Sequence, residues 1–486
     1  MRGTGEYLFT GRENVPYRFL EGQLCESWEV SADKVVFHIR PGIMFTGNTH
    51  IGMEPREYTA DDTVFNIQRY RESAIGKDAV YWVSDVYAED KYTCVVEMSE
   101  YNANWCNELG WRDRAGQIAH EAVEAPGGAW EWKNQVGTGS FILTEYVEGS
   151  YAAYKRNPDY WGQTTINGKE YQTPFIDKLV WPLMSDVSTK VATLRTGTAD
   201  ILDMYDPSLV YEDSLEQTNP ELMKYKFLPG GIDLVALKCN SEYFSNREVR
   251  RAMMIGTDLR AIIKAILGEG DIHSFPINSN ITGIYTPLEE LPPSARELFE
   301  YDPVKAKQMI IDAGYPNGFS IELVCYMTAD DQDRASMLKE QWAKIGVDCE
   351  ITALDRAVAE HLRATHDYKD AFMWGTGNST VPLHVSVGMS GKLYNIAEFS
   401  DPYFDKLYMD AEKSVDFDDM YALLKEACVY LTNEVAYIPL GSGKSLVWWW
   451  PWVKNYYGET EAAFCNYMPM INSLWIDQVM KANMGY

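Results

Sequence analysis

Residues 136–162 read VGTGSFILTEYVEGSYAAYKRNPDYWG, and this stretch predicts a β-hairpin between two lobes. Apolar and aromatic residues alternate imperfectly with polar ones on both sides of residues 148–150, whose Glu-Gly-Ser composition is typical of a turn. Gly137 and Gly139 permit a sharp backbone turn before the first strand. Pro158 ends the return strand because proline has no N–H to donate to the sheet.

Length and charge narrow the classes of protein to which the chain can belong. At 486 residues it is too long for one ordinary core, so two or three lobes are expected. It carries 43 Lys and Arg against 71 Asp and Glu, a formal charge of −28. This balance argues against nucleic acid and anionic lipid as partners, since both require a basic surface. Nor does the sequence contain an apolar run of the roughly 18 residues that a membrane-spanning helix needs.

The eight cysteines contain no CxxC pair and no zinc-type spacing. Several lie within apolar strand or helix patterns, so buried free thiols are favoured over disulfides. The seven histidines include no HExxH motif. We therefore predict no metal site and no cofactor.

Outward from the hairpin, the chain alternates strand and helix patterns. On the N-terminal side, residues 20–40 predict a hairpin, and Thr59 with Asp62 forms a capping box that opens a helix. These belong to a predicted small subdomain of about residues 30–135. On the C-terminal side, residues 175–203 read as strand, helix, strand, and the alternation continues from residue 233 to about 440. Such alternation is typical of α/β units, whose sheets are covered by helices.

Three segments resemble the extracellular solute-binding proteins of family 5, the peptide, nickel and sugar receptors of ABC importers. They are GTG followed by strand, turn, strand and RNPDYWG in residues 137–162, LCESWEVS in residues 24–31, and VATLRTGTADILD in residues 191–203. The resemblance spans about residues 6–480. It implies an α/β fold of the periplasmic-binding-protein-like type II, with two lobes joined by a hinge and an extra small subdomain in the first lobe.

The resemblance also implies where the lobes divide. Lobe I comprises residues 1–236, with the small subdomain at about 30–135, and the chain returns to it over residues 441–486. Lobe II comprises residues 237–440. Hinge motion is expected at the two crossings, residues 235–240 and 438–442.

The implied function is that of a receptor that closes two lobes around a small polar solute, such as an oligopeptide, a peptide-like molecule or an oligosaccharide. The receptor would deliver this solute to the permease subunits of an ABC transporter. The implied location is extracytoplasmic, in the periplasm or at the cell surface as a lipoprotein. An export signal and a first strand of the family pattern are missing from this sequence, and membrane contact would come through the permease or a lipid anchor absent from this chain.

The motifs of common enzymes do not occur. Residues 441–445 read GSGKS, but the glycine that a phosphate-binding loop requires five positions before Gly443 is Ile438. A hydrolase whose paired carboxylates meet in a cleft remains an alternative, because such a pair can be distant in sequence. A surface protein that kept the fold and lost its ligand is a third possibility. Ligand-dependent stabilisation without turnover favours the receptor.

Trp374 is the first candidate for ligand contact, because it holds the place of a family tryptophan that packs on the ligand. Core packing is the other interpretation of this residue. Peptide-binding members carry an aspartate just downstream for the ligand's ammonium group, but no acid occurs here between Trp374 and Leu383. Since an unpaired buried ammonium is costly, we expect a polar ligand that lacks one.

Further candidates surround the predicted cleft. Beyond Trp374, the predicted ligand-binding residues are Thr376, Asn378, Ser379, Phe45, Trp448 and Trp450. The hydroxyl and amide groups among them suit neutral hydrogen bonds, and the aromatic rings suit apolar or sugar surfaces. Within the tryptophan run, alternate residues are expected to face the core, because successive side chains of a strand point to opposite faces.

Overall fold

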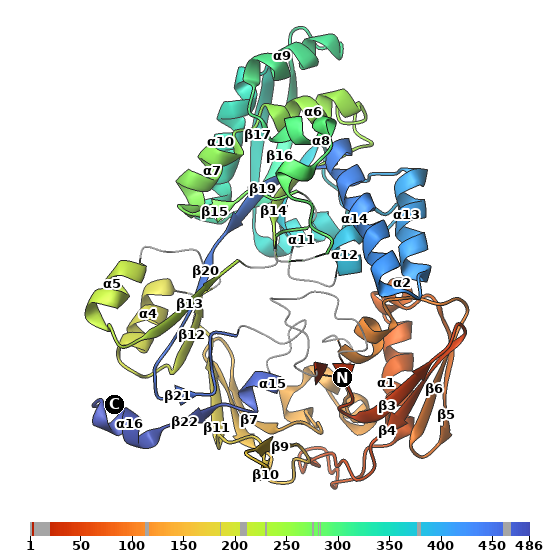
Figure 1. Cartoon of the computed structure of the whole chain (residues 1–486), viewed down its shortest axis with the longest axis vertical. Coiled ribbons are helices and arrows are strands. Elements are labelled where there is room, and N and C mark those ends of the chain that lie inside the picture. Colours follow the sequence, from red (N-terminus) through yellow and green to blue (C-terminus); the bar gives the residue numbers. More distant parts are fainter. Residues whose placement is uncertain are drawn as a thin grey trace. The chain divides into compact units, whose positions relative to one another are not determined.

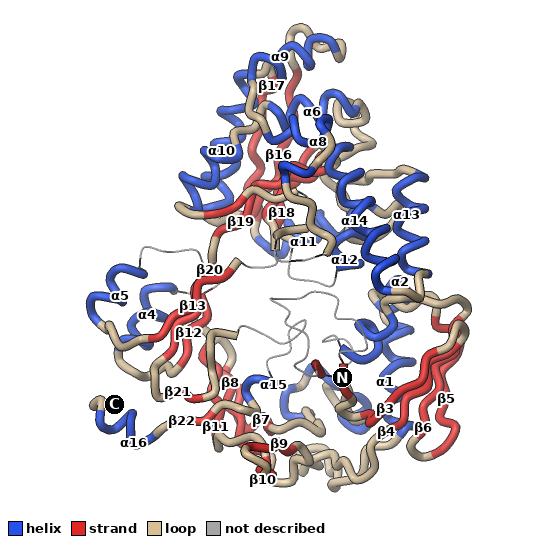
Figure 2. Tube along the Cα trace, in the orientation of Figure 1, coloured by secondary structure: helices blue, strands red, loops and turns tan. Residues whose placement is uncertain are grey.

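The computed structural model describes most of the chain (Figures 1 and 2). The described residues are 2–3, 20–111, 116–184, 186–204, 211–228, 231–274, 277–279, 281, 283–376, 381–459 and 468–486. They fall into two compact units, unit 1 with residues 20–226 and Leu446–Tyr486, and unit 2 with Phe227–Ser445. The domain boundaries expected at 236/237 and 440/441 stay a prediction. None of the helices described here combines the length and apolar character needed to cross a membrane.

The N-terminal part of unit 1 is a four-stranded antiparallel sheet in the order β3-β4-β6-β5. The strands are β3 (Cys25–Val30), β4 (Lys34–Ile39), β5 (Val83–Asp90) and β6 (Thr93–Met98). Helix α1 (Ala60–Glu72) packs against β5 and β6. At its start, the Asp62 carboxylate accepts a hydrogen bond from the Thr59 N–H at 3.0 Å, which confirms the predicted capping box.

The hairpin predicted within residues 136–162 is formed by β7 (Phe141–Val147) and β8 (Tyr151–Arg156). Gly149 occupies the turn with a φ of 67°, a conformation that glycine adopts without strain. Strand β11 (Lys178–Pro182) pairs with β8, so the sheet order is β11-β8-β7. The hairpin and the third strand of its sheet lie within unit 1, and the prediction that the hairpin stands between two lobes stays a prediction.

A second three-stranded sheet receives the returning chain. Its order is β12-β20-β13, from β12 (Ile201–Met204), β20 (Ser445–Trp449) and β13 (Met223–Phe227). Helix α4 (Val187–Arg195) contributes Val191 and Leu194 to a core that also holds the tryptophans of residues 448–452. The other elements of unit 1 are β1 (Arg2–Gly3), β2 (Leu20–Glu21), α2 (Gly76–Ala79), the π-helix η2 (Asn107–Trp111), α3 (His120–Glu124), η4 (Gly128–Trp130), η5 (Trp132–Asn134), β9 (Gln163–Ile166), β10 (Lys169–Gln172), α5 (Glu212–Thr218), β21 (Val453–Lys454), α15 (Met468–Ile471), β22 (Trp475–Ile476) and α16 (Gln478–Asn483).

Unit 2 is built on a six-stranded mixed sheet in the order β15-β19-β14-β18-β16-β17. The strands are β14 (Asp233–Leu237), β15 (Gly270–Asp271), β16 (Phe319–Tyr326), β17 (Val347–Leu354), β18 (Ala371–Gly375) and β19 (Tyr437–Gly443). The helices and helical turns are α6 (Arg247–Ile255), α7 (Leu259–Ile262), η7 (Ile263–Leu267), η8 (Leu288–Glu290), α8 (Pro293–Arg296), η9 (Glu297–Phe299), α9 (Pro303–Asp312), α10 (Ala329–Lys344), α11 (Arg356–Thr365), α12 (Val381–Val385), η10 (Ser386–Gly388), α13 (Pro402–Lys413) and α14 (Phe417–Glu434). The predicted α/β alternation is confirmed.

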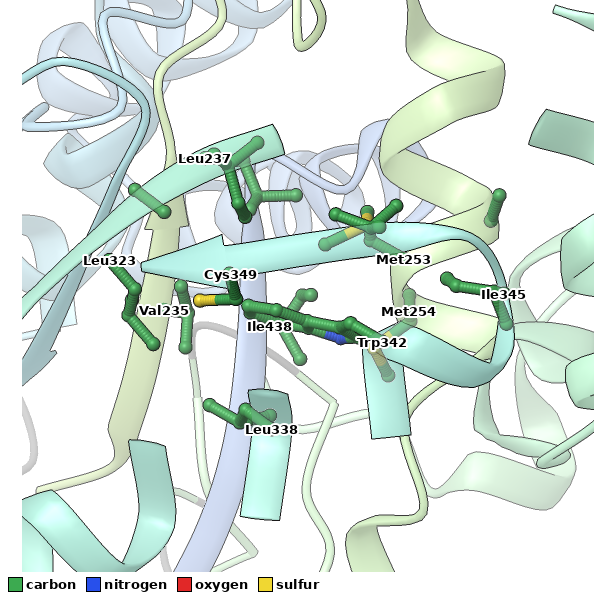
Figure 3. Close-up of a cluster of buried hydrophobic side chains, with 14 of the residues drawn as sticks. Val235, Leu237, Met253, Met254, Leu323, Leu338, Trp342, Ile345, Cys349 and Ile438 are labelled. Carbon is green, nitrogen blue, oxygen red and sulfur yellow. The ribbon is translucent and has the colours of Figure 1, made fainter. Parts of the chain in front are cut away.

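The core of unit 2 lies between the sheet and its helices (Figure 3). Val235 and Ile438 from neighbouring strands pack there with Trp342 of α10, which is fully buried. The Trp342 indole donates a hydrogen bond to the Thr257 hydroxyl at 3.0 Å, so its only polar atom is satisfied. A continuous apolar core of this kind holds the strand ends in fixed positions.

The cysteines follow the sequence expectation. All seven cysteines in the described ranges are free, and six of them are buried. Burial raises the pKa of the Cys94 and Cys349 thiols to about 12. Free thiols are confirmed for these seven and burial for six of them, Cys239 being half-buried, and Cys465 lies outside the described residues.

Candidate functional site

One edge of the unit 2 sheet collects the ends of several strands. Strands β16, β17 and β18 are parallel, so their carboxyl ends meet at one edge. Strand β14 is antiparallel to β18 and β19, which brings Asp233 opposite Gly375 and Gly441. Ligands of α/β proteins bind outside the carboxyl ends of the parallel strands. This edge is therefore the candidate site.

Trp374 lies at this edge, next to the last residue of β18, and is half-buried. The guanidinium carbon of Arg363 stands 5.2 Å from the centroid of its ring and 5.9 Å from that of Tyr394. This geometry is a cation–π contact. One face of Trp374 is thus occupied by a side chain of the protein.

Arg363 is held in turn by a hydrogen-bonded carboxylate. Its Nε donates to Glu360 Oε2 at 2.8 Å, and the Tyr326 hydroxyl donates to Glu360 Oε1 at 2.6 Å. Burial raises the pKa of Tyr326, and the bond to Glu360 acts in the same direction. Burial alone would raise the pKa of Glu360, but the bonds from Tyr326 and Arg363 lower it. Glu360 is therefore a carboxylate that orients two neighbours.

Asp233 supplies an acid beside Trp374. Its Oδ2 lies 3.1 Å from an Arg334 Nη2, and Arg334 Nη1 lies 3.2 Å from Asp331 Oδ1. A β-carbon at Gly375 would come within 2.8 Å of Asp233 Oδ1, so any other residue here would require this carboxylate to shift. Burial raises the pKa of Asp233 although Arg334 opposes the shift. Asp233 therefore pairs with Arg334 through Oδ2, and its Oδ1 lies toward Gly375.

Thr376 follows directly and is buried. Its hydroxyl accepts from the Ile232 N–H at 2.9 Å and donates to the Ile232 carbonyl at 3.2 Å. Both hydrogen-bonding functions are therefore used within unit 2, which leaves little capacity for a ligand. Asn378 and Ser379 lie outside the described residues.

The remaining three predicted contacts lie in cores of unit 1. Phe45 is 0% exposed, packs edge-on against Tyr58 at 5.6 Å and lies under the guanidinium of Arg56 at 4.9 Å. Trp448 and Trp450 are 1% and 0% exposed. A ring without exposed surface offers nothing to a solute, so the geometry assigns all three to packing. The sequence predicted that alternate tryptophans of residues 448–450 face the core, but all three are buried.

Sequence reasoning missed four members of the site: Asp233, Tyr326, Glu360 and Arg363. Asp233 and Tyr326 stand at strand ends, so for these two the signal was present as polar residues at the ends of strands, whereas Glu360 and Arg363 lie in helix α11. What the sequence lacked was the strand order that brings β14 beside β18.

Unit 2 gathers aromatic and charged side chains at the carboxyl ends of parallel strands, an arrangement that suits the binding of a small solute. The chain belongs to the bacterial extracellular solute-binding proteins, family 5, whose middle-region model matches residues 20–396. The resemblance seen in the sequence and the implied fold class are thereby confirmed.

Individual relatives are distant but similar over most of their length. The chain is 25% identical to heme-binding protein A of Haemophilus influenzae over 468 residues, which is 90% of this chain and 81% of the relative. It is also 25% identical to the dipeptide-binding protein of Escherichia coli over 445 residues, 85% of this chain and 78% of the relative. Among solved structures, the Helicobacter pylori periplasmic binding protein DppA in complex with the peptide STSA has a TM-score of 0.77 at 21% identity, and covers 97% of this chain and 91% of its own.

Proposed function

We propose that this solute-binding protein is the receptor of an ABC importer for a short peptide or peptide-like molecule, which it delivers to permease subunits outside the cytoplasm. The observation that carries this proposal is the meeting of Asp233, Trp374 and the Glu360–Arg363 pair at one sheet edge. Names of relatives support it, since they include dipeptide-binding and glutathione-binding proteins.

The chemistry of Asp233 favours a ligand with a free ammonium group. The sequence disfavoured such a ligand because no acid follows Trp374, but the fold brings an acid to the same place from β14. In the part of the chain that the structure describes, Oδ1 of Asp233 has no hydrogen-bond donor, while Oδ2 faces Arg334. A ligand ammonium would add a second cation beside a carboxylate that one cation does not fully stabilise.

The predicted closure of two lobes is part of this proposal. Both expected hinges begin inside paired strands of unit 2, β14 and β19, where bending would break hydrogen bonds. We therefore place the bending where pairing ends, before Ile232, which still bonds Thr376, and at Lys444, which separates β19 from β20. Ligand binding should then compact the molecule, and small-angle scattering at saturation measures this.

The test is calorimetry with a matched pair of ligands, Ala-Phe and N-acetyl-Ala-Phe, together with thermal unfolding. We expect the free amine to bind more tightly, and Asp233→Asn to abolish that preference. The matched control is Asp348→Asn, an exposed carboxylate near the opposite end of β17. Equal binding of both peptides by the parent protein would refute the role of Asp233.

Incubation of the protein with these peptides also separates the receptor from the two alternative functions. Release of free amino acids from the peptide would favour the hydrolase. If peptides, glutathione, heme and oligosaccharides all leave the melting temperature unchanged, a surface protein that lost its ligand is the better account. A melting temperature that rises without product formation supports the receptor.

A further inference from the structure

Unit 2 has a concave surface whose lining includes none of the described residues of the candidate site. It is a pocket of about 630 Å³. One face of helix α14 forms its floor, with Ala422, Lys425, Val429 and Asn433 spaced by three or four residues. Tyr403 at the start of α13 and the segment 286–294 form its walls. Its volume lies in the range of small-molecule sites, about 300–1,000 Å³.

A buried arginine fixes two sides of this pocket to each other. Arg251 is only 4% exposed. Its Nη1 donates to Asn433 Oδ1 at 3.0 Å, and its Nη2 donates to the Ser294 carbonyl at 2.8 Å. Because Oδ1 of Asn433 is committed to Arg251, the amide Nδ2 of that residue remains to donate elsewhere. The pocket is therefore preformed, with a donor at one end.

Two aromatic rings are fixed at the other side. Tyr403 and Tyr430 contact each other edge-on, with ring centroids 5.0 Å apart. The Tyr430 hydroxyl donates to Asp401 at 3.0 Å, and the Tyr403 hydroxyl donates to Glu426. Since both hydroxyls are engaged, the pair presents mainly apolar ring surface to the pocket.

Three polar groups of the lining have no partner among the residues that the structure describes. The Thr286 hydroxyl oxygen is buried and makes no hydrogen bond, although the Thr286 carbonyl accepts one from Ser274 at 2.8 Å. Lys425 and Glu290 both line the pocket, yet no ion pair joins them to each other or to another described side chain. Opposite charges that share a pocket without pairing can be bridged by a ligand that carries both signs.

We propose that this pocket binds a free amino acid with an aromatic or large apolar side chain. The ligand carboxylate meets Lys425 and the Asn433 amide, and the ligand ammonium meets Glu290. The side chain packs on Tyr403, Tyr430 and Val429. Charge-assisted hydrogen bonds supply orientation, and burial of the side chain supplies affinity. This site is additional to the solute site of the proposed receptor.

The test uses 4-fluoro-L-phenylalanine as the probe, followed by fluorine NMR with the full chain. Val429→Trp fills the pocket and should weaken binding at least tenfold, whereas Trp374→Ala, in the candidate solute site, should change it less than twofold. Ala422→Trp is the second filling variant, because Ala422 is exposed and tolerates bulk. Circular dichroism checks that each variant folds. The proposal is overturned if the probe does not bind the parent protein, or if only Trp374→Ala weakens it.

Ligand analogues test the two charges separately. Phenethylamine lacks the carboxylate, so Lys425→Met should weaken 4-fluoro-L-phenylalanine about tenfold and leave phenethylamine unchanged. The compound 3-phenylpropionate lacks the ammonium. Glu290→Gln should therefore weaken the binding of 4-fluoro-L-phenylalanine and leave the binding of 3-phenylpropionate unchanged. The matched control is Glu289→Gln, the neighbouring carboxylate that does not line the pocket. Equal effects of these variants on all three compounds would show that the charges do not contact the ligand and would overturn the assignment.

Discussion

Tryptophans in the two units have the same chemistry and opposite environments. Trp448, Trp449 and Trp450 belong to or adjoin β20, the middle strand of its sheet, and all are at most 5% exposed. Trp374 is the second last residue of β18 and is half-buried, with Arg363 over its ring. Place within the sheet, rather than residue type, thus decides whether an aromatic ring can meet a solute.

The strongest test of this comparison is Trp450→Ala. Trp450 is 0% exposed, stacks on Trp452 at 4.4 Å with an interplanar angle of 5°, and donates to the Leu194 carbonyl at 2.9 Å. Deleting a buried aromatic side chain costs about 3–5 kcal/mol. Urea unfolding should show a loss of this size, and Trp374→Ala should lose clearly less. Equal losses would contradict the distinction between the two sites.

Burial also determines whether a polar side chain can be charged, and His273 is an example. It is 0% exposed, and neither ring nitrogen has a hydrogen-bond partner within the described ranges. Burial lowers its pKa from 6.5 to about 4, and Asp271 opposes the shift only partly. Between pH 6.5 and about pH 4, His273 is protonated in the unfolded chain but remains neutral in the folded chain. The contribution of His273 is therefore constant above pH 6.5 and falls by about 3 kcal/mol as the pH approaches 4.

Urea unfolding between pH 4 and pH 7 measures this dependence. His273→Phe should flatten the slope over that range, because phenylalanine fills a similar space and cannot bind a proton. His50→Gln is the matched control, since His50 is exposed. If both variants keep the parent protein's dependence of unfolding free energy on pH, groups other than His273 cause the loss of stability in acid.

On the exposed side of the comparison, Trp374→Ala should weaken ligand binding at least tenfold, about 1.4 kcal/mol, and leave the fold intact. The reason is that the ring face not covered by Arg363 can pack on a solute and remove apolar area from water. Calorimetry with the best-binding peptide measures it. Normal binding by this variant would make Trp374 a core residue like those of β20.

The alternation of strands and helices in unit 2 could be predicted from the sequence, because its signals are local. Asn246, Asp258 and Asp302 lie just before helices α6, α7 and α9, and each side chain accepts a hydrogen bond from the first turn of its helix. These features depend only on neighbours in the chain.

The site could not be predicted to the same degree, because it depends on pairing between distant segments. Asp233 and Gly375 are far apart in sequence and become neighbours only through the order of β14 and β18. Phe45 was predicted to contact the ligand, yet its ring packs against Tyr58 and the guanidinium of Arg56 and is fully buried. Local patterns fix elements, whereas long-range packing determines which side chains remain accessible.

The smallest expected effect is that of Thr376→Val, and it tests whether the end of β18 serves the fold or the ligand. Valine keeps the shape of threonine but cannot bond the N–H and carbonyl of the buried Ile232. Because the Thr376 N–H still donates to the Ile232 carbonyl at 2.9 Å, we expect a loss of only about 1 kcal/mol in stability. Peptide affinity should change less than twofold, and Thr376→Ser should restore the stability because it keeps the hydroxyl. A tenfold loss of affinity at unchanged stability would instead show that this hydroxyl meets the ligand, as its neighbour Trp374 is expected to do.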